Sequence, residues 1–176
     1  MQSQLRLYME PKLIKICLWW VYLAGLMLFV VVMTTVINIS AFGLDKAARI
    51  FDSNVSGLSG YEDLVRLLTS CIALMFFPWT QAKRGHVAVD FFADKFSSRL
   101  QQILDMLWLV CTLVFVIFLG ILMYFGMIES FNDGSVATTL GWYEWPFYIP
   151  GIISLFLWSL VLLFQVFLHK GGKING

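Results

Sequence analysis

The chain has 176 residues, of which 60% are hydrophobic and 13% are charged, and its formal net charge is +1. About a quarter of the residues in soluble domains are charged, so this composition excludes an ordinary soluble domain and indicates an integral membrane protein. The small net charge also excludes a broad basic surface that would bind nucleic acid.

The first predicted element is a transmembrane helix over about residues 13–40. The uncharged run from Ile16 to Leu44 exceeds the roughly 20 residues that cross a hydrocarbon core about 30 Å thick. It is also longer than the about 7–15 apolar residues of a signal peptide, and no small-x-small cleavage site follows it. We therefore expect an uncleaved membrane anchor.

The second predicted span covers about residues 64–82. Its uncharged run is shorter, because Arg66 and Lys83 bound it. We expect the long side chain of Arg66 to reach the membrane interface from one turn inside the helix. Ser59 and Glu62 have the S-x-x-E spacing of a capping box, which we interpret as the start signal of this helix.

The third and fourth predicted spans cover about residues 106–128 and 145–168, both long uncharged runs. All four spans should be α-helical, because lipid-facing backbone must satisfy its own hydrogen bonds and runs this continuously apolar do not alternate like barrel strands. The predicted fold class is an all-α integral membrane protein with four transmembrane helices, in a single membrane domain over residues 1–176.

An amphipathic arm helix is predicted in the second loop, over about residues 87–105. Apolar side chains recur there at helical spacing on one face, and polar side chains occupy the other. The apolar set is Val89, Phe92, Ala93, Phe96, Leu100, Ile103 and Leu107. We expect this helix to lie along the membrane, with Lys95 and Arg99 reaching phospholipid headgroups. A cytosolic helix folded over the bundle would have the same pattern.

The distribution of basic residues predicts the orientation, because cytoplasmic segments keep most of the Lys and Arg. Of the 12 such residues, nine lie in the two tails and the second loop: Arg6, Lys12, Lys15, Lys83, Arg84, Lys95, Arg99, Lys170 and Lys173. The other three are Lys46, Arg49 and Arg66. Both termini should therefore be cytoplasmic.

The two outer loops are then residues 41–63 and 129–144. The second of them carries Glu129, Asp133 and Glu144 and no basic residue. We interpret it as a solvated acidic loop, with contact to an extracytoplasmic partner as the alternative.

The predicted spans contain scattered polar side chains but no acidic residue or histidine, whereas ion-coupled carriers usually place ionisable groups or paired helix breaks at mid-membrane. We expect these side chains to form hydrogen bonds between helices. They are Thr34, Thr35, Asn38, Ser70, Thr112, Ser154 and Gln165. Trp158, at mid-span, should pack against a neighbouring helix.

No catalytic, cofactor or metal site is predicted. A transmembrane haem needs histidines within helices, whereas His86 and His169 lie at span ends. Cys17, Cys71 and Cys111 each lie in an apolar run without CxxC spacing, so we expect small core residues. No zinc-ligand spacing or nucleophile and base constellation remains, and the chain is predicted not to be an enzyme.

Two motifs resemble those of a known family. The string from Arg84 to Asp90, R-G-H-V-A-V-D, is similar to the signature of the small Q-type (DctQ-like) membrane subunit of tripartite ATP-independent periplasmic (TRAP) transporters. Leu140-Gly141, followed by Trp145-Pro146 and Tyr148, resembles the second recurrent pattern of that family. One departure is Ser97-Ser98, because relatives often carry a proline within the arm.

The resemblance implies a bacterial inner-membrane complex for organic anion uptake. A periplasmic binding protein would capture the anion, for example a C4-dicarboxylate or sialic acid, and a large M-type subunit would move it with sodium. The small subunit would support the large one without holding substrate, and its outer loops are the segments available to the binding protein. A self-sufficient four-helix carrier or small exporter that acts as an oligomer is the alternative, but such exporters need a membrane-embedded acidic residue.

The second loop and the start of the last span thus supply the residues expected at a partner or lipid interface. They are Lys83, Arg84, His86, Asp90, Phe92, Phe96, Arg99, Trp145 and Pro146. The expected partners are the large subunit, the binding protein and membrane phospholipids.

Overall fold

The computed structural model describes residues 11–48, 57–83 and 98–170. These residues form four α-helices: α2 (Pro11–Ala48), α3 (Tyr61–Ala82), α5 (Ser98–Asn132) and α6 (Tyr148–Lys170). The short 3₁₀ helix η2 (Trp145–Phe147) leads into α6. All four long helices are long and apolar enough to cross a membrane. The predicted all-α fold class with four membrane helices is therefore confirmed.

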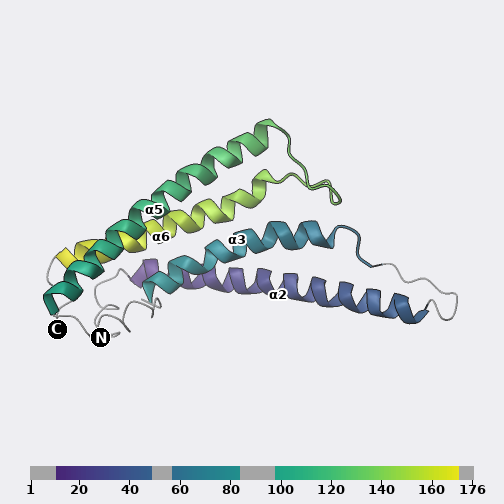
Figure 1. Cartoon of the computed structure of the whole chain (residues 1–176), viewed down its shortest axis with the longest axis horizontal. Helices are drawn as coiled ribbons and strands as arrows, with labels where there is room; N and C mark the ends of the chain where they lie inside the picture. The colour runs from purple at the N-terminus through teal and green to yellow at the C-terminus, as the bar shows by residue number, and fades with distance from the viewer. Residues whose placement is uncertain (1–10, 49–56, 84–97, 171–176) are drawn as a thin grey trace.

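The helices are arranged as two hairpins, α2 with α3 and α5 with α6 (Figure 1). Contacts between α3 and α6 join the hairpins, so these two helices lie in the middle and α2 and α5 lie outside. Burial follows this order, because 39% of the most apolar window of both α3 and α6 is buried, against 17% for α2 and 11% for α5. The outer helices therefore keep most of their apolar surface uncovered by this chain.

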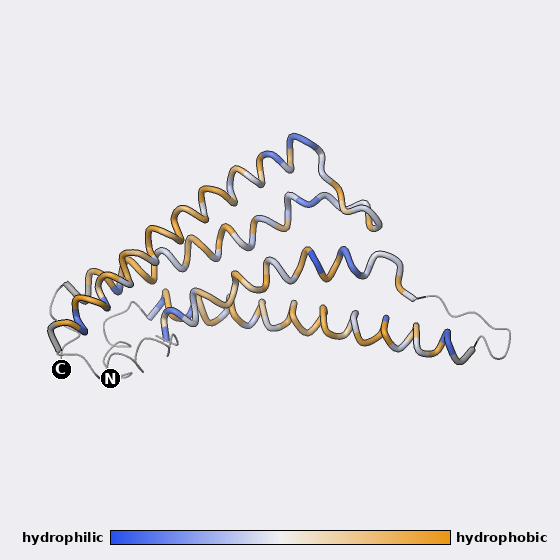
Figure 2. Tube along the Cα trace, in the orientation of Figure 1, coloured by the Kyte–Doolittle hydropathy of each residue, from blue (hydrophilic) through white to orange (hydrophobic). Residues whose placement is uncertain are grey.

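The two ends of the bundle are called the terminal end and the distal end. The terminal end holds Pro11, Ala82, Ser98 and Lys170, and the distal end holds Ala48, Tyr61, Asn132 and Trp145 (Figure 1). In this view the hairpins lie close together toward the terminal end and diverge toward the distal end. Hydrophobic residues cover the helices along their length, with hydrophilic ones concentrated toward the helix ends (Figure 2).

The outer helices are longer than the predicted spans. α2 has 38 residues and α5 has 35, so at 1.5 Å per residue they extend about 57 Å and about 52 Å, well beyond a core of about 30 Å. Residues 98–105, the last part of the predicted arm, are continuous with α5. Residues 87–97 of the arm lie outside the described residues, so that part of the arm stays a prediction.

The start of α3 differs from the capping box that the sequence indicated. Gly60 is the N-cap, with a left-handed φ of 83°, and no side chain caps the helix. A Cβ atom on Gly60 would lie 2.8 Å from Cδ2 of Leu140. Two features therefore require glycine at this position: the left-handed backbone conformation and the close approach of Leu140. The predicted pairing of Ser59 with Glu62 was wrong.

Two apolar clusters form the interior. The first joins α2 to α6 through Leu13, Cys17, Leu157 and Val161. The second joins α5 to α6 through Leu109, Val116, Leu155, Trp158 and Leu162. α6 supplies buried side chains to both clusters, which explains its central place. Trp158 stacks on Phe77 of α3 with 4.6 Å between ring centroids, as expected for a residue packed against a neighbouring helix.

The cysteines divide into two groups. Cys17 and Cys71 are buried, as predicted for small core residues, whereas Cys111 is exposed. The prediction for Cys111 was wrong because it lies on an outer helix, where an apolar position has no neighbouring helix within this chain.

Candidate functional site

The basic cluster predicted at the end of the second span is described only at its first member. Lys83 caps the C-terminus of α3 at the terminal end, and its Nζ lies 4.7 Å from the ring centroid of Trp79. Arg99 lies in the first turn of α5, but its side chain is outside the description. Also outside the described residues are Arg84, His86, Asp90, Phe92 and Phe96.

Trp145 and Pro146 lie at the other end of the bundle, in η2. Pro146 occupies the start of the helix, where the missing N–H has no helical partner to lose. The half-buried ring of Trp145 packs edge-on against Phe131 of α5, with 5.6 Å between centroids. The structure therefore separates the predicted interface residues, with Lys83 and Arg99 at the terminal end and Trp145 and Pro146 at the distal end.

A buried amide pair joins the two central helices toward the terminal end. Nε2 of Gln81 donates to Oε1 of Gln165 over 2.7 Å, and Nε2 of Gln165 donates to the backbone carbonyl of Gln81 over 2.9 Å. Nε1 of Trp158 also approaches Oε1 of Gln81, at 3.4 Å. Because all these groups are buried and bonded to one another, they fix the register between α3 and α6.

Other polar residues in the helices have varied roles. Ser154 of α6 accepts a hydrogen bond of 2.8 Å from the indole nitrogen of Trp20 in α2, so the prediction of helix–helix bonds is confirmed for Ser154 and Gln165. Oδ1 of Asn38 instead accepts from the backbone nitrogen of Leu58, in the loop before α3.

Three of the hydroxyls behave differently from the prediction. Thr34, Thr35 and Ser70 each donate to the carbonyl four residues earlier in their own helix. The prediction of helix–helix bonds was wrong for these residues. A hydroxyl that donates to a carbonyl of its own helix needs no partner on a neighbouring helix, so its presence in the sequence does not indicate which helices are in contact.

Five residues form a polar clip that connects the two hairpins at the distal end: Asp63, Arg66, Thr139, Leu140 and Glu144. The segment 133–144 folds back on itself, with a bridge between Val136 and Tyr143. Asp63, in the first turn of α3, accepts backbone hydrogen bonds from Thr139 over 2.7 Å and from Leu140 over 3.2 Å. One carboxylate therefore satisfies two backbone donors of a segment more than 70 positions away.

An ion pair completes this clip. Nη2 of Arg66 lies 2.7 Å from Oε1 of Glu144 and 3.8 Å from Oδ1 of Asp63. The side chain of Arg66 is 59% exposed and that of Glu144 is 24% exposed. The guanidinium therefore reaches the surface, as expected, but it forms an ion pair there with the carboxylate of Glu144. The interpretation of the loop as merely solvated was wrong for Glu144.

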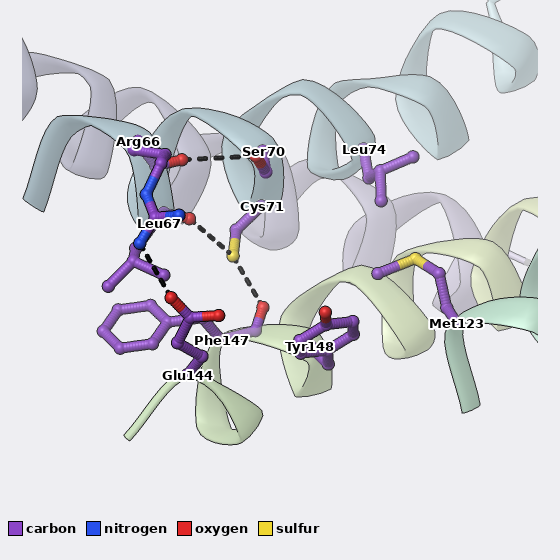
Figure 3. Close-up of a pocket in the computed structure, with 9 residues that line it drawn as sticks. All are labelled: Arg66, Leu67, Ser70, Cys71, Leu74, Met123, Glu144, Phe147 and Tyr148. Atoms are coloured by element: carbon purple, nitrogen blue, oxygen red, sulfur yellow. Dashed lines mark hydrogen bonds and ion pairs between the residues drawn. The ribbon is translucent and has the colours of Figure 1, made fainter. Parts of the chain in front are cut away.

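A cleft of about 250 Å³ opens beside the ion pair, between α3, α5 and the start of α6 (Figure 3). Its lining consists of Arg66, Leu67, Ser70, Cys71, Leu74, Met123, Glu144, Phe147 and Tyr148. The polar groups of Arg66 and Glu144 lie at one end, and Leu74 and Met123 lie at the other. A Cβ atom on Gly151 would meet the side chains of Met123 and Leu74, so this glycine lets the three helices approach at the apolar end.

The chemistry of the described residues is that of binding and support. Among residues 11–48, 57–83 and 98–170, no group of three His, Cys, Asp or Glu side chains could hold a metal ion. The cleft offers one guanidinium, one carboxylate, the hydroxyl residues Ser70 and Tyr148, and otherwise mainly apolar walls. These groups suit a ligand with a charged head and an apolar body.

Sequence reasoning missed the partners of the clip. Arg66 and Glu144 were both noticed, because each bounds an uncharged run, but neither the ion pair nor the role of Asp63 was proposed. A usable signal was present: two opposite charges at the same predicted membrane level, each beside a span end, are candidates for a pair. Gln81 was missed because a glutamine directly before the last residue of an uncharged run resembles an ordinary interfacial residue.

Comparison with known proteins gives one match. The family model described as "Tripartite ATP-independent periplasmic transporters, DctQ component" matches residues 44–169, from the end of α2 through almost all of α6. No curated protein matches the chain, and no solved structure does.

Proposed function

The chain belongs to the DctQ family, the small membrane component of tripartite ATP-independent periplasmic transporters, and from this premise we propose that it is an accessory scaffold subunit. It holds and supports the large M-type subunit, which performs sodium-coupled uptake of an organic anion delivered by a periplasmic binding protein. C4-dicarboxylates and sialic acid are the substrate class that the resemblance suggests. The chain itself holds no substrate.

The use of polar groups in the interior is the observation that supports a scaffold. Gln81 and Gln165 bond to each other, and Trp20 bonds to Ser154. A carrier needs polar groups that can exchange water for a solute at mid-membrane, whereas these groups are committed to contacts within the chain. A fixed bundle with uncovered apolar sides is suited to support a neighbour.

The uncovered sides belong to α2 and α5. The exposed apolar residues of α2 include Trp19, Tyr22, Leu26, Phe29 and Met33, and those of α5 include Val114, Phe118, Ile121, Leu122 and Phe125. Lipid and a large membrane partner are both compatible with such surfaces. Membership of the DctQ family suggests the large subunit as the partner, and the exposed apolar surfaces of α2 and α5 are the areas that it could contact.

We propose an inner-membrane location with the terminal end in the cytoplasm. The proposal is supported by the nine basic residues in the tails and the second loop, against three elsewhere. The clip and the segment 133–144 would then face the periplasm, where the binding protein docks. Alkaline phosphatase should be inactive when fused after Gly176 and active when inserted near Asn132; the reverse pattern contradicts this orientation.

The alternative function is a self-sufficient four-helix carrier or small exporter. Such a protein needs a membrane-embedded acidic residue. The runs 67–82, 106–128 and 145–168 contain no charged residue, and neither does the run from Ile16 to Leu44. No observation on the described residues favours this alternative.

Reconstitution tests the proposed function. Proteoliposomes with a sodium gradient should take up the anion only when this chain, the large subunit and the binding protein are all present. The chain should also co-purify with the large subunit. Matched vesicles that contain this chain and the binding protein alone should show no uptake above empty vesicles. Robust uptake in those vesicles contradicts the scaffold role and supports the carrier.

A further inference from the structure

The cleft between α3, α5 and α6 has a charge pattern that the scaffold role does not use. Its polar end carries Arg66 and Glu144, and the wall continues through Ser70 and Tyr148 to an apolar end at Leu74 and Met123 (Figure 3). At about 250 Å³, the cleft is smaller than the about 300–1,000 Å³ that encloses a whole drug-sized ligand. Only part of a larger amphipathic molecule fits inside.

The position of the cleft relative to the membrane matches its polarity. Arg66 directly precedes the uncharged run 67–82, and Glu144 directly precedes the run 145–168. The charged end therefore lies at the level of lipid headgroups and the apolar end at the level of acyl chains. The hydroxyl of Tyr148 lies between the two ends and points toward α3 (Figure 3), at the level where glycerol ester carbonyls would lie.

The local charge indicates the type of headgroup. Three charged side chains gather here, because Arg66 lies 2.7 Å from Glu144 and 3.8 Å from Asp63. Two carboxylates against one guanidinium leave a local charge of about −1 at neutral pH. A purely anionic headgroup is disfavoured by this excess, whereas a zwitterionic headgroup meets both signs.

The ammonium group decides between the zwitterionic lipids. A primary ammonium has three N–H donors for a carboxylate such as Glu144, whereas the quaternary ammonium of choline has none. The lipid phosphate can meanwhile accept hydrogen bonds from Arg66. The two groups of the ion pair thus have the polarity to bind a headgroup that carries both an ammonium and a phosphate.

We propose that this cleft binds one molecule of an aminophospholipid, with phosphatidylethanolamine as the probe. The ammonium contacts Glu144, the phosphate contacts Arg66, and one acyl chain enters between Leu74 and Met123. The lipid fills the space between the two hairpins at the distal end and so supports their relative position. The proposal concerns this chain alone and does not depend on transport.

Native mass spectrometry of the full-length chain in a mild non-ionic detergent tests the proposal. After delipidation, phosphatidylethanolamine, phosphatidylcholine and phosphatidylglycerol with identical acyl chains are titrated separately. One phosphatidylethanolamine should bind per chain, about tenfold more tightly than the other two lipids, the factor expected for one charge-assisted hydrogen bond. Equal binding of all three lipids, a preference for phosphatidylglycerol, or no bound lipid overturns the proposal.

Two variants change different parts of the cleft. Glu144→Gln keeps the shape but removes the carboxylate charge, and should reduce the preference for phosphatidylethanolamine over phosphatidylcholine to about twofold or less. Its control is Glu129→Gln, an exposed carboxylate outside the cleft lining. Met123→Trp fills the apolar end and should weaken all three lipids, whereas the exposed neighbour Leu122→Trp should not.

Circular dichroism and size-exclusion chromatography establish that each variant keeps its fold. If Met123→Trp proves misfolded, because the added ring meets Gly151, the Glu144→Gln comparison still decides. An unchanged lipid preference in folded Glu144→Gln contradicts the assignment of the ammonium contact and with it the proposal. The proposed scaffold function can fail independently, because its readouts are co-purification and uptake.

Discussion

Gln81 and Gln165 form a reciprocal buried pair, in which each side-chain amide donates to the other residue, over 2.7 Å and 2.9 Å. Both residues are buried. Removal of one side chain therefore leaves a buried amide atom of the other without its partner: Oε1 of Gln165 loses its donor in one case, and Nε2 of Gln81 loses its acceptor in the other. Removal of both side chains leaves neither of these amide atoms in place.

This pair predicts a strongly non-additive double-mutant cycle. Gln81→Leu and Gln165→Leu should each lower the free energy of unfolding by about 1–2 kcal/mol, whereas the double variant should lose less than the sum of the two. Unfolding in mixed detergent micelles, followed by circular dichroism, measures the three values. Ser159→Ala is the control, because its hydroxyl donates to the carbonyl of Phe156 in its own helix. Strict additivity would show that the two amides do not act together.

The second prediction is that alanine substitutions at two glycines change the free energy of unfolding in opposite directions. Gly60→Ala should lower the free energy of unfolding by about 1–3 kcal/mol, because φ is 83° there and the new Cβ would meet Leu140 at 2.8 Å. Gly43→Ala should raise it by up to about 1 kcal/mol, because Gly43 lies inside α2 with nothing within 4 Å of an added Cβ. Thermal unfolding of both variants in one detergent measures the difference. A harmless Gly60→Ala would contradict both the left-handed backbone at Gly60 and the packing of Leu140 on this turn.

The two backbone hydrogen bonds that Asp63 accepts should protect the donor amides locally from hydrogen exchange. Asp63→Ala should speed amide exchange at Thr139 and Leu140 by about tenfold or more, because the carboxylate accepts both of these N–H groups. The exchange of α6 should change little. Glu62→Ala is the matched control, since its exposed carboxylate accepts a hydrogen bond from the neighbouring Tyr61 hydroxyl. Equal effects of the two substitutions would show that acidity in this turn matters, not the clip.

The positions of the membrane helices could be predicted from the sequence because charged residues mark the ends of the uncharged runs. Arg66, Lys83 and Glu144 mark the edges of uncharged runs, and a bilayer core excludes charges strongly enough that those edges predict where spans lie. Which helices touch could not be predicted in the same way. α5 is apolar on all sides, so its sequence does not distinguish a lipid-facing position such as Cys111 from a buried one such as Val116.

The candidate site was harder still to predict. Arg66 and Glu144 are 78 positions apart, and their pairing depends on the contact of α3 with α6, which no local pattern specifies. The Gly60 cap likewise depends on the approach of Leu140 from another hairpin. Sequence reasoning favoured Ser59 and Glu62 because it considers only local partners, and a tertiary contact took precedence.

The last prediction concerns Arg84, which directly follows the C-cap residue of α3. We expect Arg84 to contact a carboxylate or lipid phosphate through two parallel hydrogen bonds at the interface with the large subunit. A planar guanidinium makes such a contact and an ammonium does not. Arg84→Lys should therefore weaken co-purification with the large subunit, or reduce uptake, while the chain still inserts in the membrane.

The competing interpretation of Arg84 is a general positive-inside anchor, for which charge alone matters. Lys83→Arg is the matched control, because it also exchanges the two basic side chains, at the neighbouring position. The ammonium of Lys83 lies over the Trp79 ring, a contact that arginine also makes, so this variant should retain complex yield and uptake. If Arg84→Lys matches the wild type in both measurements, a specific contact is excluded. In that case each basic residue contributes only its attraction to anionic lipid, about 1 kcal/mol.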